Sequence, residues 1–242
     1  MAYDSYTDSR GTTIVNYGYI VKVWSRLSSI INNNNGLAAI MGNLYSESFI
    51  VPYIVQGNIS YPFSYSITYT DNVNNGTISE NDFVYNGPNG GGYGLAQWTY
   101  KTRKQGLYDM WRKSSYTSIG DIDLACDYLI HELQNNFTNV LSYLNSNATL
   151  FDKTKYVLQN FENPSNQSIG VQNLRYDRAY AIYEYVTQTS PTDPPDDGSG
   201  TGGGGGGGNN PVSTKGYFSK RHGKVWMCMK QRFFNRRTGQ WQ

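Results

Sequence analysis

One glutamate at the end of an apolar helical segment is the residue best placed for acid chemistry in this sequence. Leu37, Ile40, Met41 and Leu44 recur at helical spacing, and Glu47 lies three residues further on, on the same apolar face. Burial there, together with the negative pole at the carboxyl end of a helix, favours the protonated form of its carboxyl group. A carboxylic acid that stays neutral near neutral pH is the proton donor that glycosidic bond cleavage needs. We therefore predict Glu47 as a general acid; the alternative is that its side chain turns to solvent beyond the helix end.

Several other kinds of chemistry lack the residues they need. The chain has two histidines, His131 and His222, which are too few for a zinc peptidase, and it has no serine nucleophile bracketed by glycines. Cys126 and His131 are five residues apart on one expected helix, so their side chains point to different faces. The glycines of residues 87–94 are not followed by the Lys-Ser or Lys-Thr pair of a phosphate-binding loop. We therefore expect no metal, no cofactor and no cysteine nucleophile.

The elements that position Glu47 follow from the spacing of apolar residues. Residues 12–31 carry an apolar helical face and are predicted as a core helix, which ends at the run of asparagines that follows. In residues 61–70 apolar and polar side chains alternate, which indicates a strand. Residues 74–76 (Asn-Asn-Gly) are typical of a hairpin turn, and residues 78–85 would supply the return strand. We therefore expect a β-hairpin inserted after the Glu47 helix.

The chain after the glycine-rich segment is predicted to be helical up to about residue 188. The five expected helices carry the following positions at helical spacing: Leu107, Met110 and Trp111; Ala125, Leu129 and Leu133; Phe137, Val140, Leu141 and Leu144; Phe151, Thr154, Val157, Leu158 and Phe161; and Leu174, Arg178, Ile182 and Val186. Thr99 is the expected N-cap of the first, and Asp121 or Asp123 that of the second. Helices therefore dominate the predicted fold.

Composition and charge divide the chain into three parts. Aromatic residues make up 15% and charged residues 16%, and the 22 tyrosines supply rings and hydroxyls of the kind that bind sugars. Residues 1–190 are the predicted folded domain, 191–214 a flexible linker rich in Gly and Pro, and 215–242 a basic aromatic tail. The positive excess belongs to this tail, which could bind anionic polymers, nucleic acid or another protein. The alternative is an extension without a fold of its own.

The cysteine content indicates that folding needs no oxidising compartment, and the hydropathy gives no sign of a membrane span. The two cysteines, Cys126 and Cys228, lie on opposite sides of the linker, so a disulfide framework is not expected. No stretch approaches the length and hydropathy of a membrane span. The first ten residues lack the basic start and apolar core of a signal peptide, so any action outside a cell would need another route.

Four groups of residues resemble motifs of the phage tail lysozyme family, in that family's order. They are residues 39–48 (AIMGNLYSES), 92–99 (GYGLAQWT), 118–121 (SIGD) with the helix after it, and 161–164 (FENP) followed by 175–180 (RYDRAY). The resemblance covers about residues 14–187 and implies a mostly helical, lysozyme-like α+β fold, which the β-hairpin insertion and the short basic C-terminal appendage would complete. It implies cleavage of the glycan of bacterial peptidoglycan by a phage tail-associated protein that opens the wall during infection.

The resemblance also implies roles for individual residues. Glu47 would be the general acid, and Tyr93, Gly94, Gln97 and Trp98 would line the saccharide groove. Trp98 would stack on a sugar ring and Gln97 would hydrogen-bond to the substrate. The alternative is that Tyr93 and Trp98 are core rings and that Gln97 makes a structural hydrogen bond. The implied partners are peptidoglycan, other phage tail proteins and, through the basic tail, anionic wall polymers. The implied location is the virion tail, for a protein made in the host cytoplasm without a signal peptide and acting at the bacterial wall.

The second catalytic carboxylate stays open at this stage. Relatives often carry an Asp just before the Asn-Gly turn, where this chain has Asn74. Asp71, Glu80 and Asp82 are the candidates, and the alternative for each is a solvated surface charge. Without a second carboxylate, the glycosidic bond would have to be attacked by a water molecule that polar groups activate, or by the substrate's own N-acetyl group. The alternatives to a hydrolase are a lytic transglycosylase and a catalytically inactive wall-binding or structural tail component.

Overall fold

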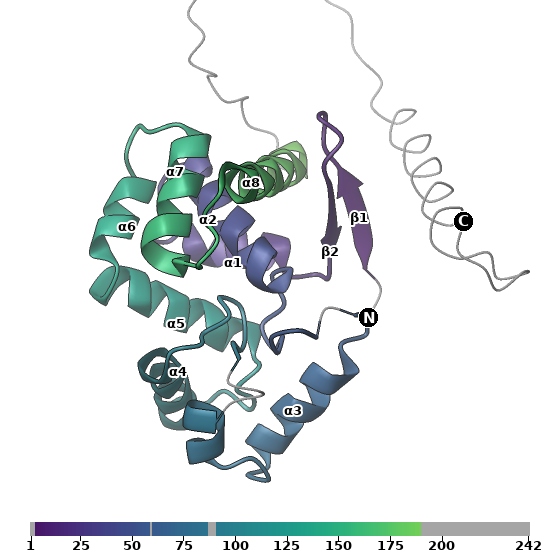
Figure 1. Ribbon diagram of the computed structural model, residues 1–242, viewed down its shortest axis with the longest axis vertical. Helices are drawn as coiled ribbons and strands as arrows, with labels where there is room; N and C mark the ends of the chain where they lie inside the picture. The colour runs from purple at the N-terminus through teal and green to yellow at the C-terminus, as the bar shows by residue number, and fades with distance from the viewer. Residues whose placement is uncertain (1–2, 59, 87–90, 190–242) are drawn as a thin grey trace, which may run out of the picture. The chain divides into compact units, whose positions relative to one another are not determined.

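The computed structural model describes residues 3–58, 60–86 and 91–189, and Figure 1 shows their arrangement. The elements are β1 (Asp4–Thr7), β2 (Thr13–Asn16), α1 (Ile20–Leu27), α2 (Asn34–Ser48), α3 (Ser64–Asn74), the π-helical turn η1 (Asp82–Asn86), α4 (Lys101–Lys113), α5 (Ile122–Asn135), α6 (Thr138–Leu144), α7 (Leu150–Val157), the π-helical turn η3 (Leu158–Glu162) and α8 (Ile169–Thr189). The described residues are thus mostly helical with a small antiparallel sheet, which confirms the predicted α+β class. The predicted linker at 191–214 and basic tail at 215–242 lie outside the described residues.

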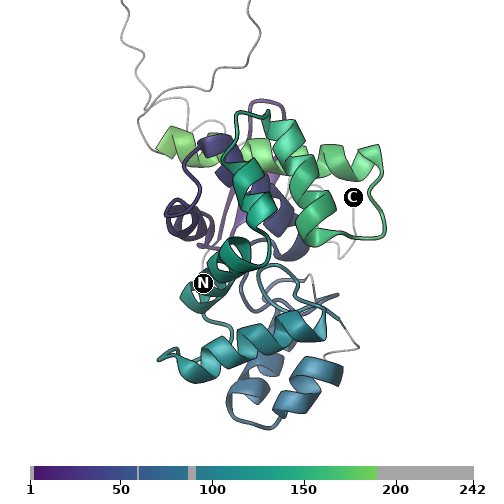
Figure 2. The same ribbon diagram turned by 90° about the vertical axis from the view of Figure 1, so that its left-hand side faces the viewer.

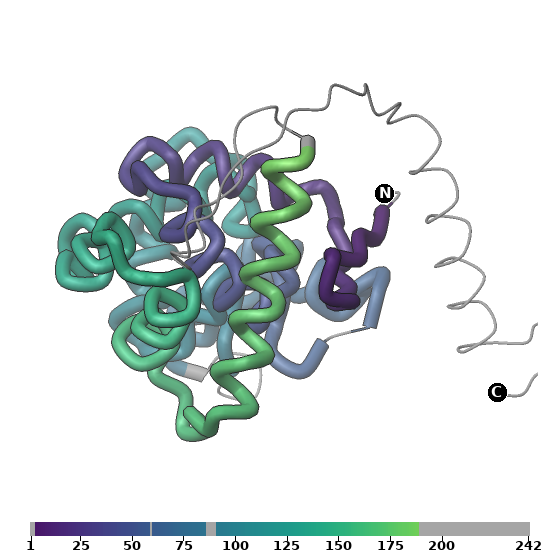
Figure 3. Tube along the Cα trace, turned by 90° about the horizontal axis from the view of Figure 1, so that it is seen from above, coloured from purple at the N-terminus to yellow at the C-terminus, as the bar shows by residue number. Residues whose placement is uncertain are grey.

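Helix α2, which carries Glu47, is the central element of the fold. Every residue from Gly36 to Tyr45 is buried, so the helix is enclosed on all sides rather than apolar along one stripe. It packs against α8, α7 and α6, and Figure 3 shows α8 running lengthwise across the described residues. Asn33 caps its first turn by accepting a hydrogen bond from the Gly36 amide. Phe49 ends the helix in the left-handed conformation, with φ of 54°. The carboxyl end of this buried helix is therefore held in a fixed place.

The crossing of α2 and α8 depends on a glycine. A Cβ atom added at Gly42 would lie 2.5 Å from the Cβ of Ala179, closer than two carbon atoms can approach. We expect Gly42→Ala to lower the free energy of unfolding by about 1–3 kcal/mol, because α8 would have to move away from α2. Denaturant unfolding measures this. Gly170→Ala is the matched control, since a Cβ there meets no atom nearer than 4.0 Å; equal losses from both changes would contradict the close packing.

The small sheet lies at the start of the chain, and this corrects the predicted helix at 12–31. Strands β1 and β2 pair antiparallel, with Asp4 opposite Asn16 and Thr7 opposite Thr13. The turn between them is built by Asp8, whose carboxylate accepts from the amides of Arg10 and Thr12 at 3.0 and 2.7 Å. The β-branched run at 13–15 suits a strand once the turn offers it a partner, so only the second half of the predicted helix forms, as α1.

The predicted hairpin at 61–85 is wrong, because residues 64–74 form helix α3. The buried residues of α3 are Ser66, Tyr69, Thr70 and Val73, which share one face at helical spacing. Ser66 and Thr70 can be buried because their hydroxyl groups have hydrogen-bond partners. The Ser66 hydroxyl accepts from the Val55 amide at 3.0 Å, and the Thr70 hydroxyl pairs with that of Tyr93 at 2.8 Å. Of the apolar residues that suggested alternation, Tyr61, Tyr65 and Ile67 are exposed, whereas Phe63 and Tyr69 are buried. The predicted return strand is replaced by η1.

The remaining helices follow the predicted order with local corrections. Asp121 caps α5 through the amides of Asp123 and Leu124, as predicted. Thr99 does not cap α4, which begins after Tyr100 without a side-chain cap. On α8, Ile182 and Val186 are buried as expected, but Leu174 is exposed, and Arg175 and Ala179 complete the buried face.

Figures 1 and 2 both place α3 and α4 at the opposite end of the described residues from α8. Within the described part of the chain, none of the helices has the length and apolar character needed to cross a membrane.

Candidate functional site

Glu47 forms an ion pair with Arg175 of α8 at the end of the central helix. The Glu47 side chain is 22% exposed and that of Arg175 is 8% exposed, so the pair lies at the edge of the interior. The Arg175 guanidinium donates to Glu47 Oε1 and also to the backbone carbonyl and side-chain oxygen of Asn43, at 3.3 and 3.2 Å. Asn43 in turn donates to the Thr154 carbonyl of α7 at 3.1 Å. The carboxyl group of Glu47 is therefore oriented by a network that joins three helices, and it is paired rather than isolated in an apolar setting.

A second glutamate, Glu162, lies close to this pair and was not among the predicted site residues. It ends the turn η3, which continues α7. Its Oε1 atom is buried and has no hydrogen-bond partner among the described residues. Burial, with the negative charge of Glu47 as the next cause, raises the pKa of Glu162 to about 8, so it is largely protonated at neutral pH. The sequence carried a signal for it: Glu162 follows an apolar helical stretch and precedes Pro164, the same pattern that pointed to Glu47.

A second ion pair lies beside Glu162. Arg103 of α4 donates to both carboxylate oxygens of Glu132 on α5, at 2.6 and 2.7 Å. The Trp98 indole N–H also donates to Glu132, at 2.7 Å. The Arg103 guanidinium lies 4.6 Å from the centre of the Phe161 ring, next to Glu162 in the chain. We call Glu47, Glu132, Glu162, Arg103 and Arg175 the charged cluster.

The burial of Trp98 and Tyr93 corrects part of the predicted saccharide groove. Both side chains are 0% exposed. The Trp98 ring packs edge-on against Tyr128, and the Tyr93 hydroxyl pairs with Thr70. A ring without exposed surface has no face to offer a sugar, so the predicted stacking by Trp98 is contradicted. Trp98 instead fixes Glu132 in the charged cluster.

Gly94 and Gln97 shape the same loop by their backbone conformations. Gly94 has φ of 79° and Gln97 has φ of 46°, and a Cβ atom at Gly94 would lie 3.0 Å from the Trp98 ring. The Gln97 amide donates to the carbonyls of Ile54 and Gly94, at 2.9 and 3.1 Å. Gln97 is partly exposed, so a role toward substrate stays a prediction for it.

The three carboxylates considered as partners of Glu47 lie on the surface. Asp71 is exposed on α3, and Glu80 and Asp82 are exposed near η1. Glu80 accepts from Gln105 at 2.8 Å, and Asp82 accepts from Ser79 at 2.7 Å. The negative charge of Glu47 instead helps to raise the pKa of another carboxyl group, that of Glu162.

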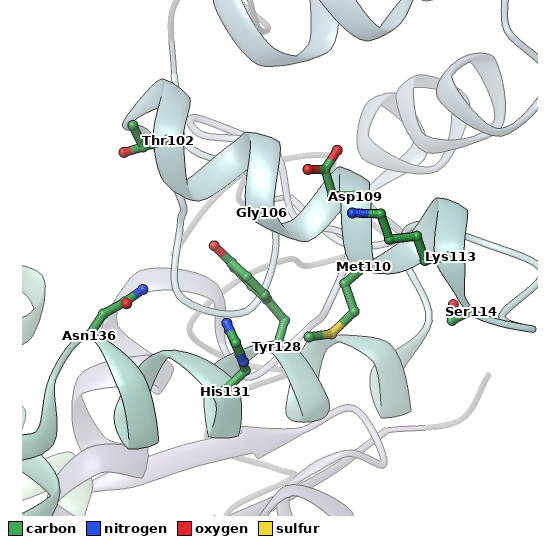
Figure 4. A pocket seen from close by; sticks show the side chains of 9 residues that line it. All are labelled: Thr102, Gly106, Asp109, Met110, Lys113, Ser114, Tyr128, His131 and Asn136. Atoms are coloured by element: carbon green, nitrogen blue, oxygen red, sulfur yellow. The ribbon is translucent and has the colours of Figure 1, made fainter.

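A surface hollow of about 530 Å³ lies elsewhere, between α4 and α5. Figure 4 shows Tyr128 and His131 of α5 facing Gly106 and Met110 of α4 across it. The predicted site residues do not line it.

The thiol of Cys126 is buried in α5, and burial raises its pKa to about 12, so it supplies no thiolate at neutral pH. Within the described ranges, no group of three or more His, Cys, Asp or Glu side chains is arranged to hold a metal ion.

Comparison with known proteins identifies a matching family model. No curated protein matches the sequence significantly. The family model described as phage tail lysozyme matches residues 20–186, a range that contains α1 to most of α8 and all five residues of the charged cluster. Because this match spans well over half of the chain, the protein belongs to the phage tail lysozyme family.

Proposed function

We propose that this protein cleaves the glycan strands of bacterial peptidoglycan and that Glu47 is its catalytic acid. The observation that carries the proposal is the partly exposed Glu47 carboxyl group at the end of a helix that is buried from Gly36 to Tyr45, held by Arg175. Membership of the phage tail lysozyme family supplies the substrate class. In this role Glu47 donates a proton to the glycosidic oxygen as the bond breaks.

The ion pair with Arg175 has a clear chemical use in such a reaction. Once Glu47 has given up its proton it is a carboxylate, and the adjacent guanidinium stabilises that negative charge. The hydrogen bonds from Arg175 to Asn43 keep the guanidinium in place before and after the transfer.

The wider biological setting follows from the family. We propose that the protein acts at the bacterial wall as part of a phage tail, opening the wall locally during infection, beside other tail proteins. The basic tail at 215–242 would bind anionic wall polymers. Gln97, which is partly exposed, would contact the saccharide, while the buried residues Tyr93, Gly94 and Trp98 support its loop from the core.

Digestion of purified peptidoglycan by the full-length protein, followed by mass spectrometry of the soluble fragments, tests the proposal. Hydrolysis gives reducing sugar ends. Anhydro ends would show a lytic transglycosylase, in which Glu47 keeps the acid role but the substrate's own hydroxyl attacks. Binding to the wall without release of fragments would contradict the proposal and favour an inactive wall-binding component.

A further inference from the structure

Arg178 of α8 is a partly exposed cation without a counter-charge among the described residues. Its guanidinium takes part in no hydrogen bond and no ion pair within the described ranges. No nitrogen atom of Arg178 is both buried and unpaired, so its N–H groups reach the surface. Four other arginines of the described ranges do pair with a carboxylate, namely Arg10, Arg26, Arg103 and Arg175. Arg178 is therefore free to bind an anion from outside the protein.

The packing of α8 on α2 places Arg178 next to the pair of Glu47 and Arg175. Arg178 follows Arg175 by three residues, so the two side chains are neighbours on one face of α8. The Arg178 guanidinium lies 5.6 Å from the centre of the Tyr45 ring, and Tyr45 precedes Glu47 by two residues on α2. The Tyr45 ring is itself held in place, because its hydroxyl accepts from the Val15 amide at 2.8 Å. Arg178 therefore lies about one helical turn from the residue that binds Glu47.

This position is unfavourable for an unpaired positive charge. Burial has the largest effect on the pKa of Arg178 and lowers it; in decreasing order, Tyr45 then raises it, Arg175 lowers it and Glu47 raises it. An arginine side chain nevertheless keeps its proton in proteins, so Arg178 stays charged. Glu47 already accepts from Arg175, so it does not serve as the partner of Arg178. A partly buried charge without a partner, beside a reactive group, is typical of a binding site.

Resting on the function proposed above, we propose that Arg178 binds a carboxylate of the peptidoglycan strand whose glycosidic bond Glu47 cleaves. The sugar rings of peptidoglycan and their N-acetyl groups are uncharged, but every second sugar bears a lactyl group that is joined to a short peptide. The carboxylate is one of that peptide or, where the peptide has been removed, the one of the lactyl group. A guanidinium binds a carboxylate through two parallel N–H···O bonds, for which the surface N–H groups of Arg178 are available. The site then prefers a carboxylate-bearing glycan to a neutral one.

This contact should act on substrate binding rather than on the chemical step. The charge of such a carboxylate does not change while the glycosidic bond breaks, so Arg178 stabilises the bound substrate and the transition state equally. Its loss should therefore raise KM and leave kcat unchanged. A charge-assisted hydrogen bond at a partly exposed position corresponds to about a tenfold change in affinity.

The first experiment measures KM and kcat on soluble peptidoglycan strands, before and after their carboxyl groups are converted to neutral amides. On the untreated strands we expect Arg178→Gln to raise KM about tenfold and to change kcat by less than about twofold. Amidation should raise the KM of the wild type by a similar factor and leave that of Arg178→Gln unchanged. Arg178→Lys keeps the charge without the planar fork and should restore binding in part. Equal KM values of the wild type on the two substrates would overturn the inference, and this comparison needs no variant.

Arg112→Gln is the matched control for the loss of an arginine. Arg112 is exposed on α4, and its guanidinium likewise lies over an aromatic ring, 5.2 Å from the centre of that of Trp111. Helix α4 lies at the opposite end of the described residues from α8, so Arg112→Gln should keep the wild-type KM on both substrates. Strands freed of peptide by an amidase distinguish the two sources of the carboxylate. A KM difference between the wild type and Arg178→Gln that is confined to intact strands assigns the peptide, and one that persists on peptide-free strands assigns the lactyl group.

Direct binding of fluorescently labelled strands, followed by anisotropy, separates the inference from the proposed function. Binding that depends on Arg178 and on the carboxylates, with no release of fragments by the wild type, would refute the proposed function and leave the inference standing. Release of fragments with the same KM in the wild type and in Arg178→Gln would refute the inference and leave the function standing.

Discussion

Glu47→Gln is expected to lower the rate of peptidoglycan solubilisation by about three orders of magnitude, because a positioned acid contributes about 10²–10⁴-fold. The Gln side chain keeps the shape of Glu and still accepts a hydrogen bond from Arg175, but its amide does not supply a catalytic proton. The loss of turbidity of purified bacterial walls, together with the amount of soluble fragments, measures the effect. Binding to the walls should persist, since the fold is unchanged.

Two controls make this result specific to Glu47. Glu80→Gln removes one carboxylate from the surface, where it accepts a hydrogen bond from Gln105, and should retain wild-type activity. Thermal unfolding of Glu47→Gln should show a cooperative transition near that of the wild type, because the larger network of Asn43 and Arg175 remains. Activity of Glu47→Gln close to that of the wild type would remove Glu47 from the mechanism.

Glu132→Leu is expected to cause the largest loss of stability, about 3–5 kcal/mol in the free energy of unfolding. Glu132 is 0% exposed and accepts three hydrogen bonds, two from Arg103 and one from the Trp98 indole. Its removal leaves the Arg103 guanidinium, only 14% exposed, without the carboxylate that it is hydrogen-bonded to, and the indole N–H without its acceptor. Denaturant unfolding followed by tryptophan fluorescence measures the loss.

The double variant Glu132→Leu with Arg103→Met separates loss of packing from loss of charge balance. Replacing both members of a buried ion pair by apolar side chains is often close to neutral, so the double variant should regain most of the stability lost by Glu132→Leu. If the single variant loses less than about 1 kcal/mol, the pair is more solvated than its burial indicates.

Several features of the fold could be predicted because they depend on residues near one another in the chain. The helical spacing of Leu129 and Leu133 predicted α5, and Asp121, one of the two caps expected with Asp123, does cap it, since an N-cap bonds to amides two or three residues on. The apolar run before Glu47 correctly indicated a helix that ends near this residue. The sequence did not predict that this helix is the central one, because burial of its other face depends on which elements of the fold pack against it.

Prediction failed where polar residues are buried and apolar residues are exposed. Tyr65 and Ile67 gave α3 the alternating pattern of a strand, yet both point to solvent, while Ser66 and Thr70 face the core. The hydroxyl groups of Ser66 and Thr70 are satisfied by Asn58, Val55 and Tyr93, partners up to 23 residues away. Periodicity alone does not reveal such partners, so the wrong period was favoured.

The sequence by itself determined that Glu47 ends an apolar helix and, through the motifs, that the chain belongs with phage tail lysozymes. Only the tertiary structure decided what surrounds that carboxyl group. Arg175 lies 128 residues from Glu47 along the chain, and Glu162 lies on a turn that packs near it only after α7 and α8 fold against α2. Charges act through space over a few ångströms, so whether Glu47 is isolated, paired or coupled to a second acid depends on helix packing.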